Sequence, residues 1–112
     1  GFMFYYVVTC RFEGTDPTLS EKWLTWLIPG HIDDVLQAGA VSAEILRLDD
    51  EMPHFQINYR FDSREDFQRY ERDHAPRLRA EGLSRFPLEL GLKFRRWTGV
   101  PVAIMKKSSS GI

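Results

Sequence analysis

Two histidines of this 112-residue chain, His31 and His74, stand in matching surroundings. An imidazole exchanges a proton near neutral pH, so each residue is a candidate general base. Each follows two aromatic residues spaced three apart, and each precedes an apolar residue by four positions and a glycine by eight. The two sets are Trp23, Trp26, His31, Val35 and Gly39, and Phe67, Tyr70, His74, Leu78 and Gly82.

This repeat is typical of two copies of one strand–helix unit, each of which buries an aromatic stripe on a common sheet. If the stripes also enclose a pocket, the pocket suits a small apolar ligand. Its predicted ligand-binding residues are Trp23, Trp26, Phe67 and Tyr70, and its candidate catalytic residues are His31, His74 and Tyr70.

The same pattern has a purely structural interpretation, which we favour on the sequence alone. Aromatic stripes at helical spacing fill the core between a helix and a sheet, and each histidine then bonds to free backbone groups or to a nearby acid. Asp34 lies one turn from His31, and Glu71 lies one turn before His74. No third polar group stands at a diagnostic spacing, so we recognise no catalytic motif.

The elements that would position the first set begin with a strand over residues 3–12, which is apolar on both faces and therefore central. Asp16 is predicted to cap the following helix, with Pro17 in its first position. Proline and glycine at positions 29 and 30 predict a kink or break in that helix. The helix then resumes and ends at Gly39.

The second half of the chain predicts two strands, at about 41–48 and 55–61, joined by a polar hairpin. A second helix runs from a cap near Ser63 to about residue 81 and bends at Pro76. A last strand covers residues 92–98. Beyond it, we expect an extra strand or arm from Val100 to Met105 and a disordered tail over residues 106–112.

The order strand, helix, strand, strand, helix, strand predicts an α+β ferredoxin-like βαββαβ fold, with a four-stranded antiparallel sheet and two helices on one face. The other face of the first strand carries Met3, Tyr5 and Val7, and an uncovered apolar face requires a partner. We therefore predict one domain over residues 1–105 that forms a homodimer, sheet against sheet. The arm either crosses to the second subunit or packs on its own helices.

The motif from Trp23 to Gly39, together with Tyr70-x3-His74-Ala75-Pro76-x-Leu78-Arg79-x2-Gly82, resembles a family of small, mostly bacterial, uncharacterised domains of the dimeric α/β-barrel type. The resemblance spans about residues 3–98 and implies the fold, but no activity. It departs at positions 29–30, where the family favours helix-forming residues, and at Asp33, where it favours proline. Related dimeric α/β barrels commonly hold a small apolar ligand between sheet and helices, and some are cofactor-free oxygenases, isomerases or decarboxylases.

Several functions are excluded by composition and spacing. A net charge of −1 gives no general attraction to nucleic acid, and no apolar run is long enough to cross a membrane. The single cysteine, Cys10, lies within a strand, where burial raises a thiol pKa, and it suits a reducing, cytoplasmic setting. We predict no metal site, because His31, His54 and His74 stand 23 and 20 residues apart. His54 is predicted to be an exposed turn residue.

The arginines divide into two groups. Those on the second helix alternate with acids, which is typical of a solvated face; they are Arg69, Arg72, Arg77 and Arg79. Arg60 instead shares a strand face with Gln56 and Asn58 and would point toward the partner subunit. There it either pairs with an acid across the interface or binds a carboxylate ligand.

Two classes of function remain. One is a homodimeric module without catalysis, which binds a small apolar ligand between sheet and helices or acts through protein interactions. The alternative is a cofactor-independent enzyme, similar to oxygenases or isomerases, that uses His31 or His74 as its general base. No cofactor is predicted in either case.

Overall fold

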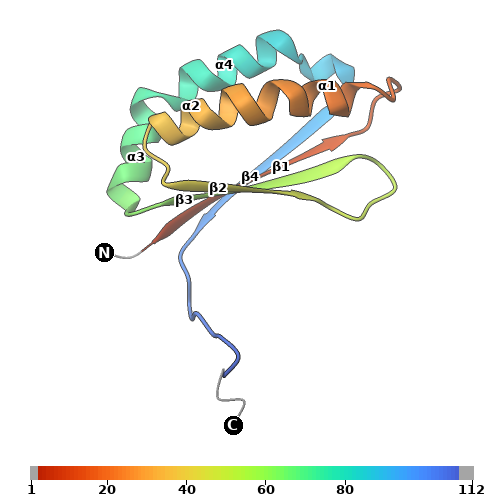
Figure 1. The fold of residues 1–112 in the computed structure, drawn as a ribbon. Helices are drawn as coiled ribbons and strands as arrows, with labels where there is room; N and C mark the ends of the chain where they lie inside the picture. The colour runs from red at the N-terminus through yellow and green to blue at the C-terminus, as the bar shows by residue number, and fades with distance from the viewer. Residues whose placement is uncertain (1–2, 109–112) are drawn as a thin grey trace.

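The computed structural model describes residues 3–108, and Figure 1 shows how its elements are arranged. Their order is β1 (Phe4–Phe12), α1 (Leu19–Trp26), η1 (Leu27–His31), α2 (Ile32–Gln37), β2 (Ser42–Arg47), β3 (His54–Phe61), α3 (Arg64–Asp73), α4 (Ala75–Arg85), η2 (Leu88–Leu90) and β4 (Leu92–Gly99). The segment η1 is a π-helical turn, and η2 is a 3₁₀ turn.

The four strands form one antiparallel sheet in the order β2-β3-β1-β4. The strand β1 is central, as predicted, and Tyr6 at its middle pairs with Tyr59 of β3 and Thr98 of β4. All the helices cover one face of the sheet and leave the other face open (Figure 1). The ferredoxin-like βαββαβ fold predicted from the sequence is therefore confirmed.

The core lies between the sheet and the helices, where alternate side chains of β1 and β3 point. On β3 these inward residues are Phe55, Ile57, Tyr59 and Phe61, and all are buried. Cys10 of β1 is also buried here, which raises the pKa of its thiol to about 12. That thiol is inert at neutral pH, as expected for a structural cysteine.

The first helix begins two residues later than predicted. Asp16 accepts hydrogen bonds from the backbone amide and the hydroxyl of Thr18, at 2.8 and 2.7 Å, and closes a local turn before the helix. The helix starts at Leu19, so Asp16 is not its cap and Pro17 is not its first residue. The short Asp16 side chain bonds the backbone two residues on, which favours a turn over a helix start.

The predicted interruption of this helix takes the form of the π-helical turn η1. The amide of Ile32 donates to the carbonyl of Leu27, five residues back, and Trp26, His31 and Ile32 all keep helical backbone angles. The chain therefore passes Pro29, which has no amide hydrogen to donate, without leaving the helical region. The helix then ends before Gly39, whose φ of +134° favours glycine.

The second helical segment is divided at His74, where φ is −128° and ψ is −40°. Pro76 lies in the first turn of α4, where its missing amide hydrogen costs no helical bond. The Ser63 hydroxyl caps α3 by accepting from the Asp66 amide at 3.0 Å. The bend predicted near Pro76 is confirmed, and α4 continues to Arg85, farther than the predicted end at about residue 81.

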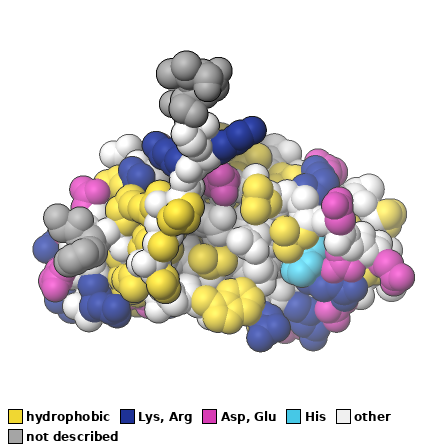
Figure 2. Space-filling model, turned by 90° about the horizontal axis from the view of Figure 1, so that it is seen from below, with side chains coloured by type: hydrophobic (Ala, Val, Ile, Leu, Met, Phe, Trp, Pro, Cys, Tyr) yellow, Lys and Arg dark blue, Asp and Glu magenta, His cyan; other side chains and the backbone are white. Residues whose placement is uncertain are grey.

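The open face of the sheet carries Tyr5 and Val7 of β1 and Trp97 of β4. Figure 2 looks onto this face and shows hydrophobic side chains gathered on one half of it, near the base of the C-terminal arm, and charged ones toward the other end. Among the described residues, no helix is long and apolar enough to cross a membrane.

The C-terminal arm, Val100–Met105, forms no strand and extends away from the domain. Its large apolar side chains are half exposed or more, and Val102 is 100% exposed. Of the two predicted alternatives, an extra strand or an arm, the described chain has the arm. Residues 106–108 have no regular secondary structure, and residues 109–112 of the predicted tail lie outside the described residues.

Candidate functional site

A small cavity lies between the sheet and the helices, and its volume is about 60 Å³. Its wall combines aromatic rings with a few polar groups. The lining residues are Tyr6, Val8, Trp23, Trp26, Leu27, His31, Tyr59, Tyr70, Leu78, Arg79, Gly82, Leu83, Phe94 and Arg96. A mostly apolar wall with a few converging polar groups is the usual chemistry of a small-molecule site.

Four of the residues singled out in the sequence meet at this cavity, namely Trp23, Trp26, Tyr70 and His31. Phe67 does not line it: its ring packs in the core against Phe4 and Phe61, with ring centroids 5.1 and 5.3 Å apart. Helical periodicity correctly predicted that Phe67 faces the core. It did not predict that the ring lies in a part of the core away from the cavity.

Two further candidates lie elsewhere. His74 is absent from the cavity wall, although its Nδ1 is buried and has no hydrogen-bond partner among the described residues. Arg60 lies on the open face of the sheet, where its Nη1 is 3.5 Å from the sulfur of Met3. The sequence does not show which candidate residues line the cavity. That depends on how each helix packs on the sheet.

His31 lines the cavity and has an imidazole nitrogen without a hydrogen-bond partner in the described chain. Its ring stacks on Trp26, with centroids 4.8 Å apart and an interplanar angle of 27°. Its Nδ1 is buried and has no hydrogen-bond partner among residues 3–108. Burial lowers the pKa of His31, the charge of Asp34 opposes this shift, and the charge of Arg96 adds to it. The lowered pKa keeps the imidazole neutral at pH 7.

Arg79 turns toward the cavity instead of joining the solvated face predicted for it. Its Nη2 donates to the hydroxyl of Tyr6 at 3.0 Å and to the carboxylate of Glu71. Glu71 is therefore the partner of Arg79, and the bond predicted between Glu71 and His74 does not form. The Nε of Arg79 is buried and lacks a partner within the described chain.

The tyrosine hydroxyls stay protonated. Burial, together with the neighbouring Tyr6, raises the pKa values of Tyr59 and Tyr70 well above the ordinary value of a phenol. The ring of Tyr59 stacks on that of Tyr6 with centroids 5.8 Å apart. These groups can therefore donate hydrogen bonds to a polar atom of a ligand at neutral pH.

The cavity mouth lies beside Trp26, where α4 comes close to the first helix. A Cβ atom at Gly82 would lie 3.2 Å from the ring of Trp26, so the absence of a side chain there lets the indole approach α4. Leu83 and Arg96 are exposed at the rim. Part of the cavity wall is thus exposed to solvent here, and we call this part the mouth.

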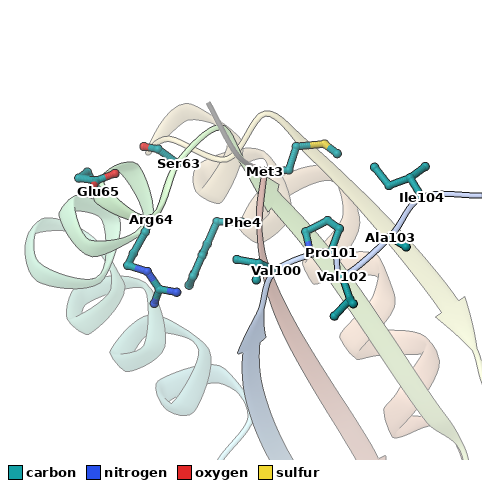
Figure 3. A pocket seen from close by; sticks show the side chains of 10 residues that line it. All are labelled: Met3, Phe4, Ser63, Arg64, Glu65, Val100, Pro101, Val102, Ala103 and Ile104. Carbon is teal, nitrogen blue, oxygen red and sulfur yellow. The ribbon is translucent and has the colours of Figure 1, made fainter.

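A second hollow, about 940 Å³ in volume, lies between the arm and the domain (Figure 3). Its walls come from Met3 and Phe4, the start of α3 and the arm residues Val100 to Ile104. The guanidinium of Arg64 lies 4.6 Å from the centre of the Phe4 ring. Half of the residues that line this hollow belong to the exposed arm.

No group of three or more potential metal ligands occurs among residues 3–108. His54 begins β3 and is not the free turn residue predicted. Its Nδ1 lies 2.9 Å from the carboxylate of Asp50, which Arg11 also binds. These contacts, with the Arg11 bond as the larger cause, hold the pKa of Asp50 well below its usual range.

Sequence reasoning missed Arg79 and Arg96 as cavity residues. Strand alternation could have found Arg96, which faces the same side of β4 as Phe94 and pairs with the inward-facing Val8. Arg79 stands in the motif that carries the family resemblance, but like the other arginines of its helix it alternates with acids, which favoured a solvated face.

Residues 3–97 match the model of a family described as a domain of unknown function (DUF4286). The chain belongs to this family. The DUF4286 match covers both repeats and all four strands, up to Trp97. No curated protein matches the chain significantly.

Solved structures extend the likeness to other proteins. One is a dimeric ferredoxin-like protein from an uncultured marine organism, with 17% identity, a TM-score of 0.68 and coverage of 93% of this chain and 99% of that one. Another is a monooxygenase from Streptomyces coelicolor in complex with nanaomycin D, with 18% identity, a TM-score of 0.71 and coverage of 96% and 94%. A third is SnoaB, a cofactor-independent oxygenase from Streptomyces nogalater, with 12% identity, a TM-score of 0.68 and coverage of 96% and 100%. At these identities the likeness shows the fold alone.

Proposed function

We propose that this DUF4286 domain binds a small aromatic molecule in the cavity between sheet and helices. The observation that carries the proposal is His31, which lines this aromatic-walled cavity and whose buried Nδ1 has no hydrogen-bond partner within the described chain. A buried polar atom without a partner is costly, and a ligand that bonds to it removes that cost. The stacked pair of Trp26 and His31 gives a flat surface for an aromatic ring.

The size of the cavity sets a condition on binding. A volume of about 60 Å³ accommodates a few water molecules, whereas cavities that hold drug-sized ligands are about 300–1,000 Å³. The ligand is therefore either very small or enters as the mouth widens. Trp26 and Leu83 are the side chains whose outward rotation widens it, because both are partly exposed.

Phenol is a suitable probe for this site, because it combines one aromatic ring with one hydroxyl. We expect millimolar phenol to shift the NMR signals of the His31 imidazole and the Trp26 indole. His31→Gln should weaken phenol binding several-fold, and His74→Gln, the matched variant in the second repeat, should leave it unchanged. Shifts confined to the open sheet face, equal losses in both variants, or no shift at all would refute the proposal.

A second candidate is cofactor-independent catalysis with His31 as the general base. The neutral imidazole favours this role, because its unprotonated nitrogen can take a proton from a bound hydroxyl and leave an oxyanion beside Arg79 and Arg96. Two proteins of similar fold, described as a monooxygenase and a cofactor-independent oxygenase, support the choice of reaction class. Neither His74 nor Tyr70 is as suitable: His74 is outside the cavity wall, and Tyr70 holds its proton tightly.

Oxygen uptake with 1-naphthol as the trial substrate tests this candidate. The wild-type protein should consume dioxygen above the buffer rate, and His31→Gln should lose at least about ten-fold of that activity. The His74→Gln variant should keep it. Uptake that survives in His31→Gln would exclude this base.

We also propose that the domain is a homodimer in which the open faces of two sheets pack together. The face carries Tyr5, Val7 and Trp97, and the exposed arm adds an apolar segment beside it. Arg60 has a buried Nε without a partner within residues 3–108, so an acid of the second copy is the fitting partner. A protein of the same fold is described as dimeric. The buried single cysteine agrees with a cytoplasmic setting.

Sedimentation measurements distinguish this dimer from a monomer. Trp97→Glu should produce monomers, because it places a charge within the apolar face. Leu83→Glu is the matched control, since Trp97 and Leu83 are each 45% exposed but Leu83 lies on the helical side. Removal of the arm after Gly99 should weaken dimerisation without unfolding the domain. A dimer that survives Trp97→Glu, or dissociates equally in Leu83→Glu, would place the interface elsewhere.

A further inference from the structure

We infer that the ligand of the cavity is an anion, an aromatic carboxylate, whose charged group is held at the mouth by the guanidinium of Arg96. This inference rests on the proposed binding site and specifies the class of molecule that it takes. It comes from the balance of charge around the cavity and from the position of Arg96 on β4.

Arg96 is directed toward the helices by the pairing of β4 with β1. It stands opposite Val8, whose side chain is in the core, and it lines the cavity with Phe94. Its guanidinium lies 5.2 Å from the centre of the Phe94 ring. It forms no ion pair with any residue that the structure describes, so its charge at the mouth has no acidic partner.

Arg79 behaves differently, because Glu71 compensates its charge and Tyr6 binds the same Nη2 atom. The Nε of Arg79 remains buried and without a partner in the described chain. Arg79 therefore brings a compensated positive charge to the cavity wall, and Arg96 brings an uncompensated one. Their neighbouring acids are Glu71, which is engaged by Arg79, and Asp34, which acts on His31.

The charge of Arg96 acts on the interior of the cavity. After burial, it adds to the lowering of the pKa of His31, and it opposes the rise that burial causes in the pKa of Tyr70. An anion is stabilised by such a field, and a carboxylate matches the planar guanidinium in shape and in paired hydrogen bonds. A cation would be repelled by Arg96.

The aromatic lining of the cavity indicates that the ligand contains an aromatic ring. Trp26, stacked on His31, and Tyr6, stacked on Tyr59, all line the cavity, so its wall is rich in rings. A planar ring between them, with its carboxylate toward the rim, leaves the charged group near Arg96 and in contact with solvent.

Benzoate and benzamide test the inference, because they share size and shape but differ in charge. Their dissociation constants are measured by calorimetry or NMR for the wild-type protein, Arg96→Gln and Arg95→Gln. Arg95 is the matched control, since it is adjacent in sequence but pairs with Thr9 on the opposite, open face. We expect benzoate to bind more tightly than benzamide, and Arg96→Gln to weaken benzoate alone by about ten-fold. Arg95→Gln should leave both constants unchanged, and Arg96→Lys should restore part of the loss.

The outcomes separate the two proposals. If benzamide binds as tightly as benzoate at the cavity, the site exists but its ligand is not an anion, and this inference fails alone. If Arg96→Gln weakens both molecules equally, or Arg95→Gln has the same effect as Arg96→Gln, Arg96 does not hold the carboxylate and the inference also fails. If neither molecule binds to the folded protein, the proposed binding site fails with it.

Discussion

The two helical segments repeat the same aromatic, histidine and glycine positions, yet the two histidines have different surroundings. Five positions separate Trp26 from His31, whereas four separate Tyr70 from His74. The extra residue in the first segment is absorbed by the π-helical turn η1, so His31 lies below Trp26 as an i+4 residue would in an α-helix, and their rings stack. In the second segment the backbone leaves the helix at His74, and no stacking with Tyr70 occurs.

The glycines of the two repeats are also required for different structural reasons. Gly39 has a φ of +134°, a conformation that side chains with a Cβ rarely adopt. Gly82 lies within α4 and is required only by the close approach of the Trp26 ring. The comparison teaches that a repeat in sequence preserves the positions of contact with the core, while local backbone geometry decides which copy builds a site.

The largest difference in stability between the repeats is expected when the second aromatic residue of each is replaced by alanine. Tyr70→Ala should lower the free energy of unfolding by about 3–5 kcal/mol, because Tyr70 is buried among Tyr6, Phe61 and Phe67. Trp26→Ala should cost about 1–2 kcal/mol, because Trp26 is partly exposed at the cavity mouth. Urea unfolding of both variants measures the difference, and equal losses would contradict the distinction between core and rim.

Replacing the glycines of the two repeats is expected to give a smaller difference in stability. Gly39→Ala should destabilise the protein by about 1–3 kcal/mol, since alanine must adopt a positive φ. Gly82→Ala should be within about 1 kcal/mol of wild type, because better helix propensity offsets the contact with Trp26. Thermal unfolding compares the two, and a changed Trp26 fluorescence in Gly82→Ala would identify the close approach. A larger loss in Gly82→Ala than in Gly39→Ala would reverse this assignment.

The smallest effect is a dependence of stability on pH. Because burial lowers the pKa of His31, the unfolded chain binds a proton more readily than the folded one, and stability falls as pH drops below about 6.5. His31→Gln should reduce the loss of unfolding free energy between pH 7 and pH 5. The reduction should be up to about 1.4 kcal/mol for each unit by which the pKa is lowered. Chemical denaturation at several pH values measures it, and an unchanged slope would mean that His31 is accessible to water.

The fold could be predicted because its signals are local and periodic. Alternation along residues 55–61 placed Phe55, Ile57 and Tyr59 on one buried face, and the order of elements allowed few topologies. The bend near Pro76 was also predictable, since proline cannot donate the helical bond. The start of the first helix was mispredicted because Asp16 can close a turn or cap a helix, and the sequence does not distinguish the two.

The candidate site could be predicted only in part. Periodicity identified Trp23, Trp26 and Tyr70 as inward-facing, and all three line the cavity. It also selected Phe67, which packs at a different level of the same core. Arg79 was assigned to solvent because its charge alternates with acids, and its bond to Tyr6 joins positions 73 residues apart. Contacts of that separation depend on how helix and sheet are docked.

The sequence by itself determined the βαββαβ order, the buried faces of the strands and the repeat of aromatic residues, because these follow from periodicities of two and 3.6 residues. The tertiary structure alone decided that His31 and not His74 meets the cavity, and that Arg79 lines it. The physical reason is that a cavity is a property of packed surfaces: its wall is assembled from side chains on β1, β3, β4 and two helical segments, whose relative depth and rotation are fixed only when they pack together.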